Sequence, residues 1–198
     1  DIVTEIYNFP GIKKIDSLLT INGVSSLGDV QINVITNKHI GYERIFSKIE
    51  EPIENVWTNL QLEKIIIAEP LANRFGLKVG EFLPIETPQG LKEFEILGIF
   101  TDYTTSQGYL MMARSVFEKY WDNEAITAIS INTIDSITVE EAITKLKAVT
   151  SPFEQELIIR SNQTLRNDVL IVFDRTFAVT NALRFIATLV SFIGILSA

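Results

Sequence analysis

The residue types that most often perform catalysis or bind metals are scarce in this chain. It contains one histidine, His39, and no cysteine among its 198 residues. Thiolate nucleophiles, disulfides and cysteine-based zinc sites are therefore excluded, and a single imidazole cannot build a multi-histidine metal centre. His39 lies beside Lys38 in a predicted loop, where no nucleophile–histidine pair is recognisable. We expect His39 to be a solvated loop residue, and we predict no catalytic residue.

The acidic and glycine-rich stretches do not complete a binding motif either. Glu50, Glu51 and Glu54 cluster around Pro52 but lack the Asp/Asn-Gly spacing of a calcium loop, which favours a solvated loop. No GxGxxG, P-loop or GxSxG motif is present. The glycines of the middle region mark turns instead, at Gly76, Gly80 and Gly90. The sequence thus predicts no cofactor and no metal site.

One polar segment is dense in hydroxyl groups. Thr101 to Gly108 reads TDYTTSQG and includes Asp102 and Tyr103. Such a loop can contact a partner, although an ordinary surface loop is the more frequent case. Trp57 and Trp121 leave a similar choice open between exposed contact residues and core, and core is the more frequent place for large aromatics.

Charge and composition exclude other functions. The formal net charge is −8 and the sequence pI is about 4.8. Because phosphate contacts need clustered Lys and Arg, an acidic chain without a basic stripe argues against nucleic-acid binding. Hydrophobic residues make up 46% and charged residues 21%, which indicates a folded chain. Its length suits one good-sized domain with its own core, or a domain with a small appendage.

The elements that would position any site form an α+β pattern without repeats. Strands and short helices intermix, so we predict a mixed, mostly antiparallel sheet with short helices. The predicted strands cover 12–21, 29–36, 64–68, 81–87, 91–100, 109–113, 126–133 and 156–160. The predicted helices cover 1–9, 69–75, 114–121 and 138–149, with a weak helix at 41–51, a turn-rich stretch at 22–28 and a loop at 52–61.

Two strands carry the clearest patterns. Lys64 to Ala68 (KIIIA) is continuously apolar, as in a strand buried on both faces. Leu91 to Phe100 alternates, so that Phe94 and Ile96 face a core and Gly98 marks a bulge. Farther along, Thr138-Val-Glu-Glu141 predicts a capping box that opens a helix.

The C-terminal region is predicted to be one long helix, capped by Ser161 or Asn162. A heptad-like seam of alternating four- and three-residue steps runs along it. The seam positions in residues 162–184 are Leu165, Val169, Val172, Thr176, Val179 and Leu183. Up to Arg184 the other faces are mixed, which is typical of a helix in water. An amphipathic helix packed on a sheet shows similar spacing.

The last fourteen residues, 185–198, contain no charge and are apolar or small on every face. Fourteen residues of helix reach about 21 Å, less than the roughly 30 Å of a bilayer core. We interpret them as the start of a membrane helix; a buried core helix and a terminal anchor or processing signal are the alternatives. The predicted membrane-facing residues are Phe185, Ile186, Leu189, Val190, Phe192, Ile193, Ile195 and Leu196.

The middle of the chain, Ile65 to Met112, resembles the extracytoplasmic domain of MacB/FtsX-type ABC transporter permeases. The family shows a strand, a short "la..lgl..Gd" helix and turn, a strand, a glycine turn and a "v.Gi..d" strand, and IIIAEPLANRFGLKVGEFLPIETPQGLKEFEILGIFTD has the same order. The opening FPGIKKID resembles the segment after the first membrane helix, and the closing FDRTFAVTNALRFIATLVSFIGILSA resembles the stalk and second membrane helix. The chain departs from the family at Glu81, where Asp is usual, and matches it poorly over 36–58.

The resemblance implies a non-catalytic extracytoplasmic domain at residues 1–161, a stalk helix at 162–184 and the start of a membrane helix at 185–198. It further implies a cell (inner) membrane location, with the domain facing the periplasm or the extracellular side. The implied partners are a separate ATP-binding ABC subunit, a permease dimer partner, the membrane and an extracytoplasmic partner protein. Motion driven by ATP would pass through the stalk to support export or regulation.

Two other functions remain open from the residues alone. A ligand-sensing extracytoplasmic domain of a membrane receptor would share the terminal helix, but its chain would continue after Ala198 into a signalling helix and a kinase. A permease would instead complete this membrane span and add two more. A soluble enzyme or binding protein would bury the terminal helix as core.

Overall fold

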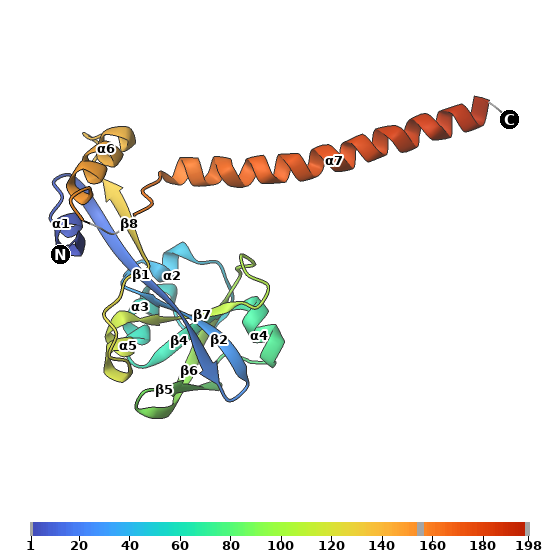
Figure 1. The fold of residues 1–198 in the computed structure, drawn as a ribbon. Coiled ribbons are helices and arrows are strands. Elements are labelled where there is room, and N and C mark those ends of the chain that lie inside the picture. The colour runs from blue at the N-terminus through green and yellow to red at the C-terminus, as the bar shows by residue number, and fades with distance from the viewer. Residues whose placement is uncertain (1, 154–156, 197–198) are drawn as a thin grey trace. The chain divides into compact units, whose positions relative to one another are not determined.

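The computed structural model describes residues 2–153 and 157–196, without the side chains of residues 168, 169, 172, 173, 175 and 176. The chain divides into two compact units, Lys13–Asn132 and Asp1–Ile12 with Thr133–Ala198. Figure 1 labels the helices and strands. Each unit is described by itself.

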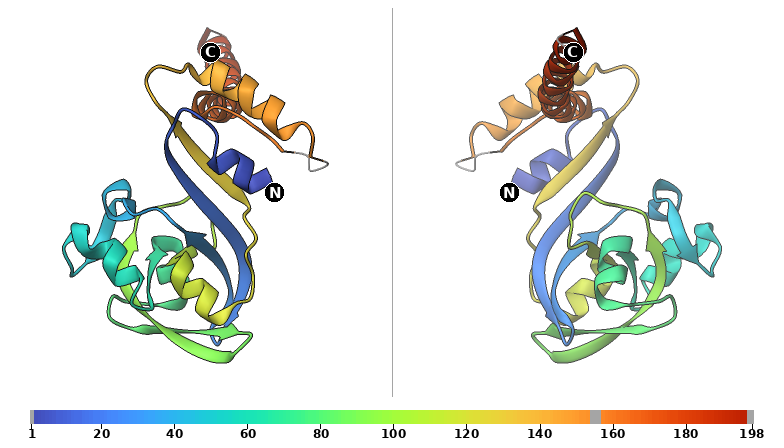
Figure 2. Two further views of the ribbon diagram at one scale, coloured as in Figure 1. Left: turned by 90° about the vertical axis from the view of Figure 1, so that its left-hand side faces the viewer. Right: turned by 90° about the vertical axis from the view of Figure 1, so that its right-hand side faces the viewer.

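The Lys13–Asn132 unit is built on one mixed sheet. Its strands are β1 (Ile12–Ser25), β2 (Gly28–Ile35), β3 (Phe46–Ile49), β4 (Lys64–Ala68), β5 (Phe82–Thr87), β6 (Gly90–Phe100), β7 (Tyr109–Ala113) and β8 (Ala128–Thr133). The strand order is β2-β7-β4-β6-β5-β1-β8, and β3 pairs with β6. Strands β1 and β8 run side by side in Figure 2. Among the described pairings, only β2–β7 and β4–β6 are parallel, so the predicted mixed, mostly antiparallel sheet is confirmed.

The sheet closes on itself because β1 also pairs with β2. That pairing is long, running from Leu18↔Ile35 to Ser25↔Gly28, whereas β1 meets β5 only at Ser25↔Ile85. The core fills the inside of this ring. Phe94 and Ile96 are buried there as predicted, and so is every residue from Ile65 to Ala68.

Glycine shapes the middle of β6. The register against β4 shifts between Ile96 and Gly98, which confirms the predicted bulge. A Cβ at Gly98 would lie 3.1 Å from the ring of Phe46 on β3. The glycine therefore lets β3 pack closely on the end of β6, where Phe46 and Phe100 make an edge-to-face contact.

Short helices connect the strands of this unit. They are α2 (Ile40–Glu43), the 3₁₀ helix η1 (Ile53–Asn55), α3 (Val56–Leu60), α4 (Glu69–Phe75) and α5 (Arg114–Tyr120). Helix α4 has Pro70 in its first turn and ends at Gly76 in the left-handed conformation, as predicted. Trp57 and Trp121 are half-buried and pack against the core, and Trp121 stacks on Phe117 with ring centroids 4.8 Å apart. The core interpretation of both tryptophans is confirmed.

The other unit contains α1 (Ile2–Tyr7), α6 (Val139–Thr150) and α7 (Asn162–Leu196). Helices α1 and α6 contact one another, and each buries a short apolar face. The capping box at the start of α6 is present in both directions, with Thr138 Oγ1 accepting from the Glu141 amide at 3.2 Å.

Several local predictions were wrong. The weak helix at 41–51 is a four-residue helix succeeded by strand β3, which pairs with β6 across a bulge between Phe46 and Lys48. The three- and four-residue spacings of Ile45, Phe46 and Ile49 are helical and do not indicate this strand. The predicted loop at 52–61 contains η1 and α3, whose Val56 and Leu60 are buried one helical turn apart.

Two strand boundaries also differ. The stretch 22–28 was expected to be turn-rich, yet β1 continues through Ser25 because its residues pair with β2. The predicted strand at 156–160 is absent over Leu157–Arg160, where Ile158 is exposed and no strand is paired. Glu156 lies outside the described residues.

Candidate functional site

His39 and the three glutamates around Pro52 do not form a catalytic or metal-binding cluster. His39 is exposed at the start of α2, and its side chain makes no capping hydrogen bond. Glu50, Glu51 and Glu54 are exposed around η1. In residues 2–153 and 157–196, no group of three or more His, Asp or Glu side chains is placed to hold a metal ion. The features that remain are helix α7 and the loop between β6 and β7.

Helix α7 is one uninterrupted element of 35 residues. At about 1.5 Å per residue it is roughly 52 Å long. Ser161 caps it, because Ser161 Oγ accepts a hydrogen bond from the Thr164 amide at 3.0 Å. The structure thereby selects Ser161 over Asn162 as the capping residue.

The C-terminal part of α7 is long and apolar enough to cross a membrane. This stretch, Phe177–Leu196, has 20 residues with a mean hydropathy of 1.8, and all of its side chains are exposed. Twenty residues of helix span about 30 Å, the thickness of a hydrocarbon core. The stretch begins eight residues before Phe185 and contains all eight predicted membrane-facing residues.

Five polar residues lie inside that stretch, namely Thr180, Asn181, Arg184, Thr188 and Ser191, and two of them have a clear way to fit a lipid environment. The long side chain of Arg184 can extend its guanidinium toward the interface. The hydroxyl of Thr188 donates to the Arg184 carbonyl at 2.8 Å, one turn back, so it needs no water.

The heptad seam stays a prediction. Leu165, Val179 and Leu183 are exposed by 47%, 64% and 62%, so their apolar surface is open to a partner helix or to lipid. The side chains of Val169, Val172 and Thr176 lie outside the described residues. Val179 and Leu183 fall within the apolar stretch, so any seam would run from water into the membrane.

The β6–β7 loop, residues 101–108, is held at its base by a cluster around Asp102. Tyr109 Oη donates to Asp102 Oδ2 at 2.7 Å, and Arg44 Nη1 lies 3.2 Å from the same oxygen. The Thr104 amide donates to Asp102 Oδ1 at 2.9 Å. The Arg44 guanidinium also lies over the ring of Phe100, 5.3 Å from its centroid. This arrangement fixes where the loop leaves β6.

Opposing effects set the pKa of Asp102. Burial alone raises it, but hydrogen bonds from Thr104 and Tyr109 and the charge of Arg44 outweigh burial, so the pKa lies below its ordinary value. The pKa of Tyr109 is raised, first by burial and then by its hydrogen bond to the carboxylate. Asp102 is therefore ionised and Tyr109 neutral at neutral pH.

Asp102→Asn is expected to lower the free energy of unfolding by about 2 kcal/mol at neutral pH, because Arg44 and Tyr109 lose a charged acceptor. A lowered carboxyl pKa stabilises the fold above its unfolded value, near 3.9, and that contribution disappears as the pH falls through the folded pKa. The difference between wild type and variant should therefore shrink in acid. Urea titrations followed by tryptophan fluorescence measure it.

Asp122→Asn is the matched control, because Asp122 is exposed and makes no hydrogen bond or ion pair within the described part of the chain. The free energy of unfolding of this variant should stay close to that of wild type at any pH. An Asp102→Asn variant as stable as wild type at neutral pH would contradict the role of this cluster.

The rest of the loop is fastened to α4. Tyr103 Oη donates to Glu69 Oε2 at 2.5 Å, and Arg74 Nη1 donates to Gln107 Oε1 at 3.4 Å. Gly108 lies so close to α4 that a Cβ would be 2.3 Å from the Leu71 amide nitrogen. The predicted exposed loop is thus surface-located but anchored at both ends.

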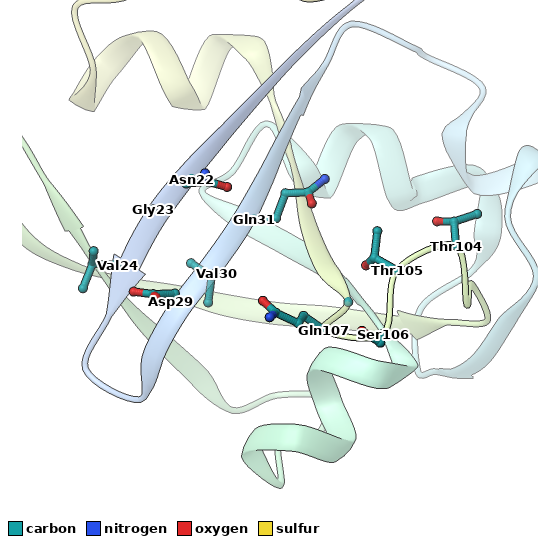
Figure 3. A pocket seen from close by; sticks show the side chains of 11 residues that line it. Asn22, Gly23, Val24, Asp29, Val30, Gln31, Thr104, Thr105, Ser106 and Gln107 are labelled. Atoms are coloured by element: carbon teal, nitrogen blue, oxygen red, sulfur yellow. The ribbon is translucent and has the colours of Figure 1, made fainter.

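A groove of about 750 Å³ lies between this loop and the β1–β2 hairpin. We call it the amide groove, and it is lined by Asn22, Gly23, Val24, Asp29, Val30, Gln31 and Thr104 to Gly108. Figure 3 shows the hairpin on one side and the loop on the other. Sequence reasoning singled out the loop but not the hairpin, since it placed a turn at 22–28.

Known proteins resemble the chain in sequence and in fold. No protein-family profile matches it. An uncharacterized ABC transporter permease protein of Mycobacterium tuberculosis is 26% identical over 204 residues, which is 100% of this chain and 24% of that protein. The chain therefore spans about a quarter of the length of this relative.

Solved structures of permease domains share the fold. The periplasmic region of MacB from Actinobacillus actinomycetemcomitans has a TM-score of 0.59 at 11% identity, covering 84% of this chain and 81% of that one. The extracellular domain of the noncanonic ABC-type transporter YknZ from Gram-positive bacteria has a TM-score of 0.54 at 12% identity, with 76% and 82% covered. The chain is thus similar in sequence to an ABC transporter permease and has the fold of MacB and YknZ extracytoplasmic regions, which confirms the MacB/FtsX-type resemblance indicated by its sequence.

Proposed function

We propose that this chain is the extracytoplasmic domain of an ABC transporter permease, and that α7 carries it into the cell membrane. The continuity of α7 is the observation that carries the proposal. A single helix of 35 residues connects an aqueous segment to a 20-residue stretch that is apolar enough to span a bilayer. A hydrogen-bonded helix without a break is stiff, so movement at its membrane end reaches its other end.

The domain itself needs no catalytic group in this function. ATP hydrolysis would take place on a separate cytoplasmic ABC subunit or domain, and the permease would act as a dimer. The stalk at 162–184 would carry the resulting motion outward, to drive export or to regulate an extracytoplasmic partner protein. The similarity to an ABC transporter permease supports this assignment.

Thiol labelling in cells tests the placement, because these 198 residues contain no cysteine and any cysteine elsewhere in the complete permease can first be replaced. In the complete permease, Glu54→Cys on exposed η1 should react with a membrane-impermeant maleimide in intact cells. Ile193→Cys, inside the apolar stretch, should react only after the membrane is dissolved.

Labelling of Glu54→Cys only after permeabilisation would place the domain in the cytoplasm and refute the proposal. Ready labelling of Ile193→Cys in intact membranes would show that α7 does not enter lipid. An unsubstituted chain, which should not react at all, is the control.

A further inference from the structure

The amide groove has no task in force transmission, and most of the side chains that line it are amides or hydroxyls. One wall of the groove is one face of the β1–β2 hairpin. Asn22 pairs with Gln31 and Val24 pairs with Asp29, so these four side chains share a face. Val30 points the other way and is buried in the core. All groove residues lie in the Lys13–Asn132 unit.

The loop supplies the opposite wall with hydroxyl and amide groups. Figure 3 shows Gln31 extending from β2 toward the loop and Gln107 extending from the loop toward β2. Gln31 Nε2 donates to Asn33 Oδ1 at 3.2 Å, and Gln107 Oε1 accepts from Arg74. These bonds orient both side chains and leave the Gln31 carbonyl and the Gln107 amino group available to a ligand.

One hydroxyl in the groove is left without a partner. Thr105 Oγ1 is buried from solvent, and no hydrogen-bond partner is found for it among the described residues. A buried polar group normally has a partner, because an unmade hydrogen bond costs free energy. A ligand hydroxyl in the groove would supply it once the Thr105 side chain turns about its Cα–Cβ bond, since the oxygen is closed to solvent in the conformation described.

The lining also excludes several ligand classes. Asp29 is the sole charged residue among the described residues that line the groove. The neighbouring Arg74 guanidinium is already bonded to the Asp29 carbonyl and to Gln107 Oε1, so the groove offers little cationic charge to phosphate or carboxylate groups. It has no aromatic side chain and only Val24 and Val30 as apolar ones, so it gives little anchorage to peptide side chains or acyl chains. The groove instead offers an array of amides and hydroxyls that can each pair with a group that is both donor and acceptor.

We propose that the amide groove binds a neutral saccharide. Sugar hydroxyls donate and accept at once, as the Asn22, Gln31 and Gln107 amides require, and one of them would satisfy Thr105. A free oligosaccharide and the sugar headgroup of a glycolipid present the same chemistry. The inference does not depend on the membrane assignment, since it rests on residues of the sheet unit alone.

NMR of the full chain tests this directly, because side-chain amide groups give their own signals. The protein is held in zwitterionic micelles, which contain no sugar, and titrated with neutral oligomers of glucose, mannose, galactose and N-acetylglucosamine. We expect saturable shifts of the Asn22, Gln31 and Gln107 side-chain amides for at least one oligomer, at millimolar or lower Kd. Alkyl maltoside added to the micelles, compared with free maltose, separates a headgroup from a free sugar.

Thr105→Val separates a binding role from a structural one. Removing an unsatisfied hydroxyl at nearly constant volume should raise the unfolding midpoint, while the saccharide Kd rises about tenfold through loss of one hydrogen bond. Gln31→Leu should weaken binding at least as much. Thr58→Val, the same chemical change at an exposed site on α3, should alter neither binding nor the groove signals.

Three results would overturn the proposal. One is that no oligosaccharide shifts the groove amides; another is that inorganic phosphate or a tri-alanine peptide does so instead. The third is that Thr105→Val and Gln31→Leu bind as wild type does. None of these results bears on the cysteine labelling above, so failure of this inference is distinguishable from failure of the proposed function.

Discussion

Leu170→Pro in the assembled permease is expected to leave ATP hydrolysis running while abolishing the ATP-driven movement of the extracytoplasmic domain. Leu170 is exposed in the part of α7 that precedes the apolar stretch, and it lies off the predicted seam. Proline removes a helical hydrogen bond and clashes with the preceding turn, a cost of about 3 kcal/mol that is relieved by a kink. A kinked stalk bends instead of transmitting displacement.

The movement can be followed by energy transfer from a fluorophore on Glu54→Cys to an acceptor in the lipid headgroups, alongside ATP turnover. Leu170→Ala is the matched control, because it removes the same side chain but favours the helix. In the Leu170→Ala variant, ATP hydrolysis should still move the extracytoplasmic domain. If Leu170→Pro still moved the domain on ATP addition, the stalk function would be wrong.

The same assay tests whether the seam packs against a partner helix, separately from whether the stalk helix is stiff. Val172→Asp places a charge at a predicted seam position, where a packed partner helix would make it costly. Asn167→Asp introduces the same group off the seam. Loss of coupling in Val172→Asp alone would support a packed seam, and equal behaviour of the two variants would refute it.

Gly108→Ala is expected to lower the free energy of unfolding by about 3 kcal/mol. Gly108 has φ +70, which strains a residue with a side chain by about 1 kcal/mol. The new Cβ would also lie 2.3 Å from the Leu71 amide nitrogen, a backbone atom that cannot turn aside. Overpacking of this kind adds about 1–3 kcal/mol. The loop must therefore move away from α4.

Gly76→Ala is a close control, since Gly76 has φ +69 but nothing within 4 Å of its added Cβ. Gly76→Ala should lower the free energy of unfolding only by the cost of holding a non-glycine residue at positive φ, about 1 kcal/mol. Urea unfolding followed through Trp57 and Trp121, which pack on the same core, gives both values. Equal losses in the two variants would mean that the close approach at Gly108 carries no energy.

The effect of Gly108→Ala also bears on the amide groove. The loop forms one wall of the groove, and Gly108 ends the loop. Because the substitution displaces that wall, the side-chain amide signals of Gln107 and Gln31 should shift even without ligand. Gly76→Ala should leave them in place.

Local sequence patterns predicted an element correctly where its residues fitted a single period and a single environment. The continuous apolar run of Lys64–Ala68 predicted a strand buried on both faces, and the proline and glycine flanking α4 predicted its limits. Phe46 shows where such patterns fail. Its spacing from Ile49 is helical, and the pairing of β3 with the end of β6 overrides that local pattern.

The sequence by itself determined the fold class, the absence of cysteine and multi-histidine chemistry, and the apolar character of the C-terminal helix. These properties result from composition and short-range periodicity, which do not depend on the path of the chain. Only the tertiary structure decided that β1 closes the sheet onto β2 and that Asp102 meets Arg44, 58 positions away. The amide groove has the same origin, because residues near 22–31 and 104–108 become neighbours only when β2 lies parallel to β7. Contacts between distant segments depend on strand order, and no local spacing encodes that order.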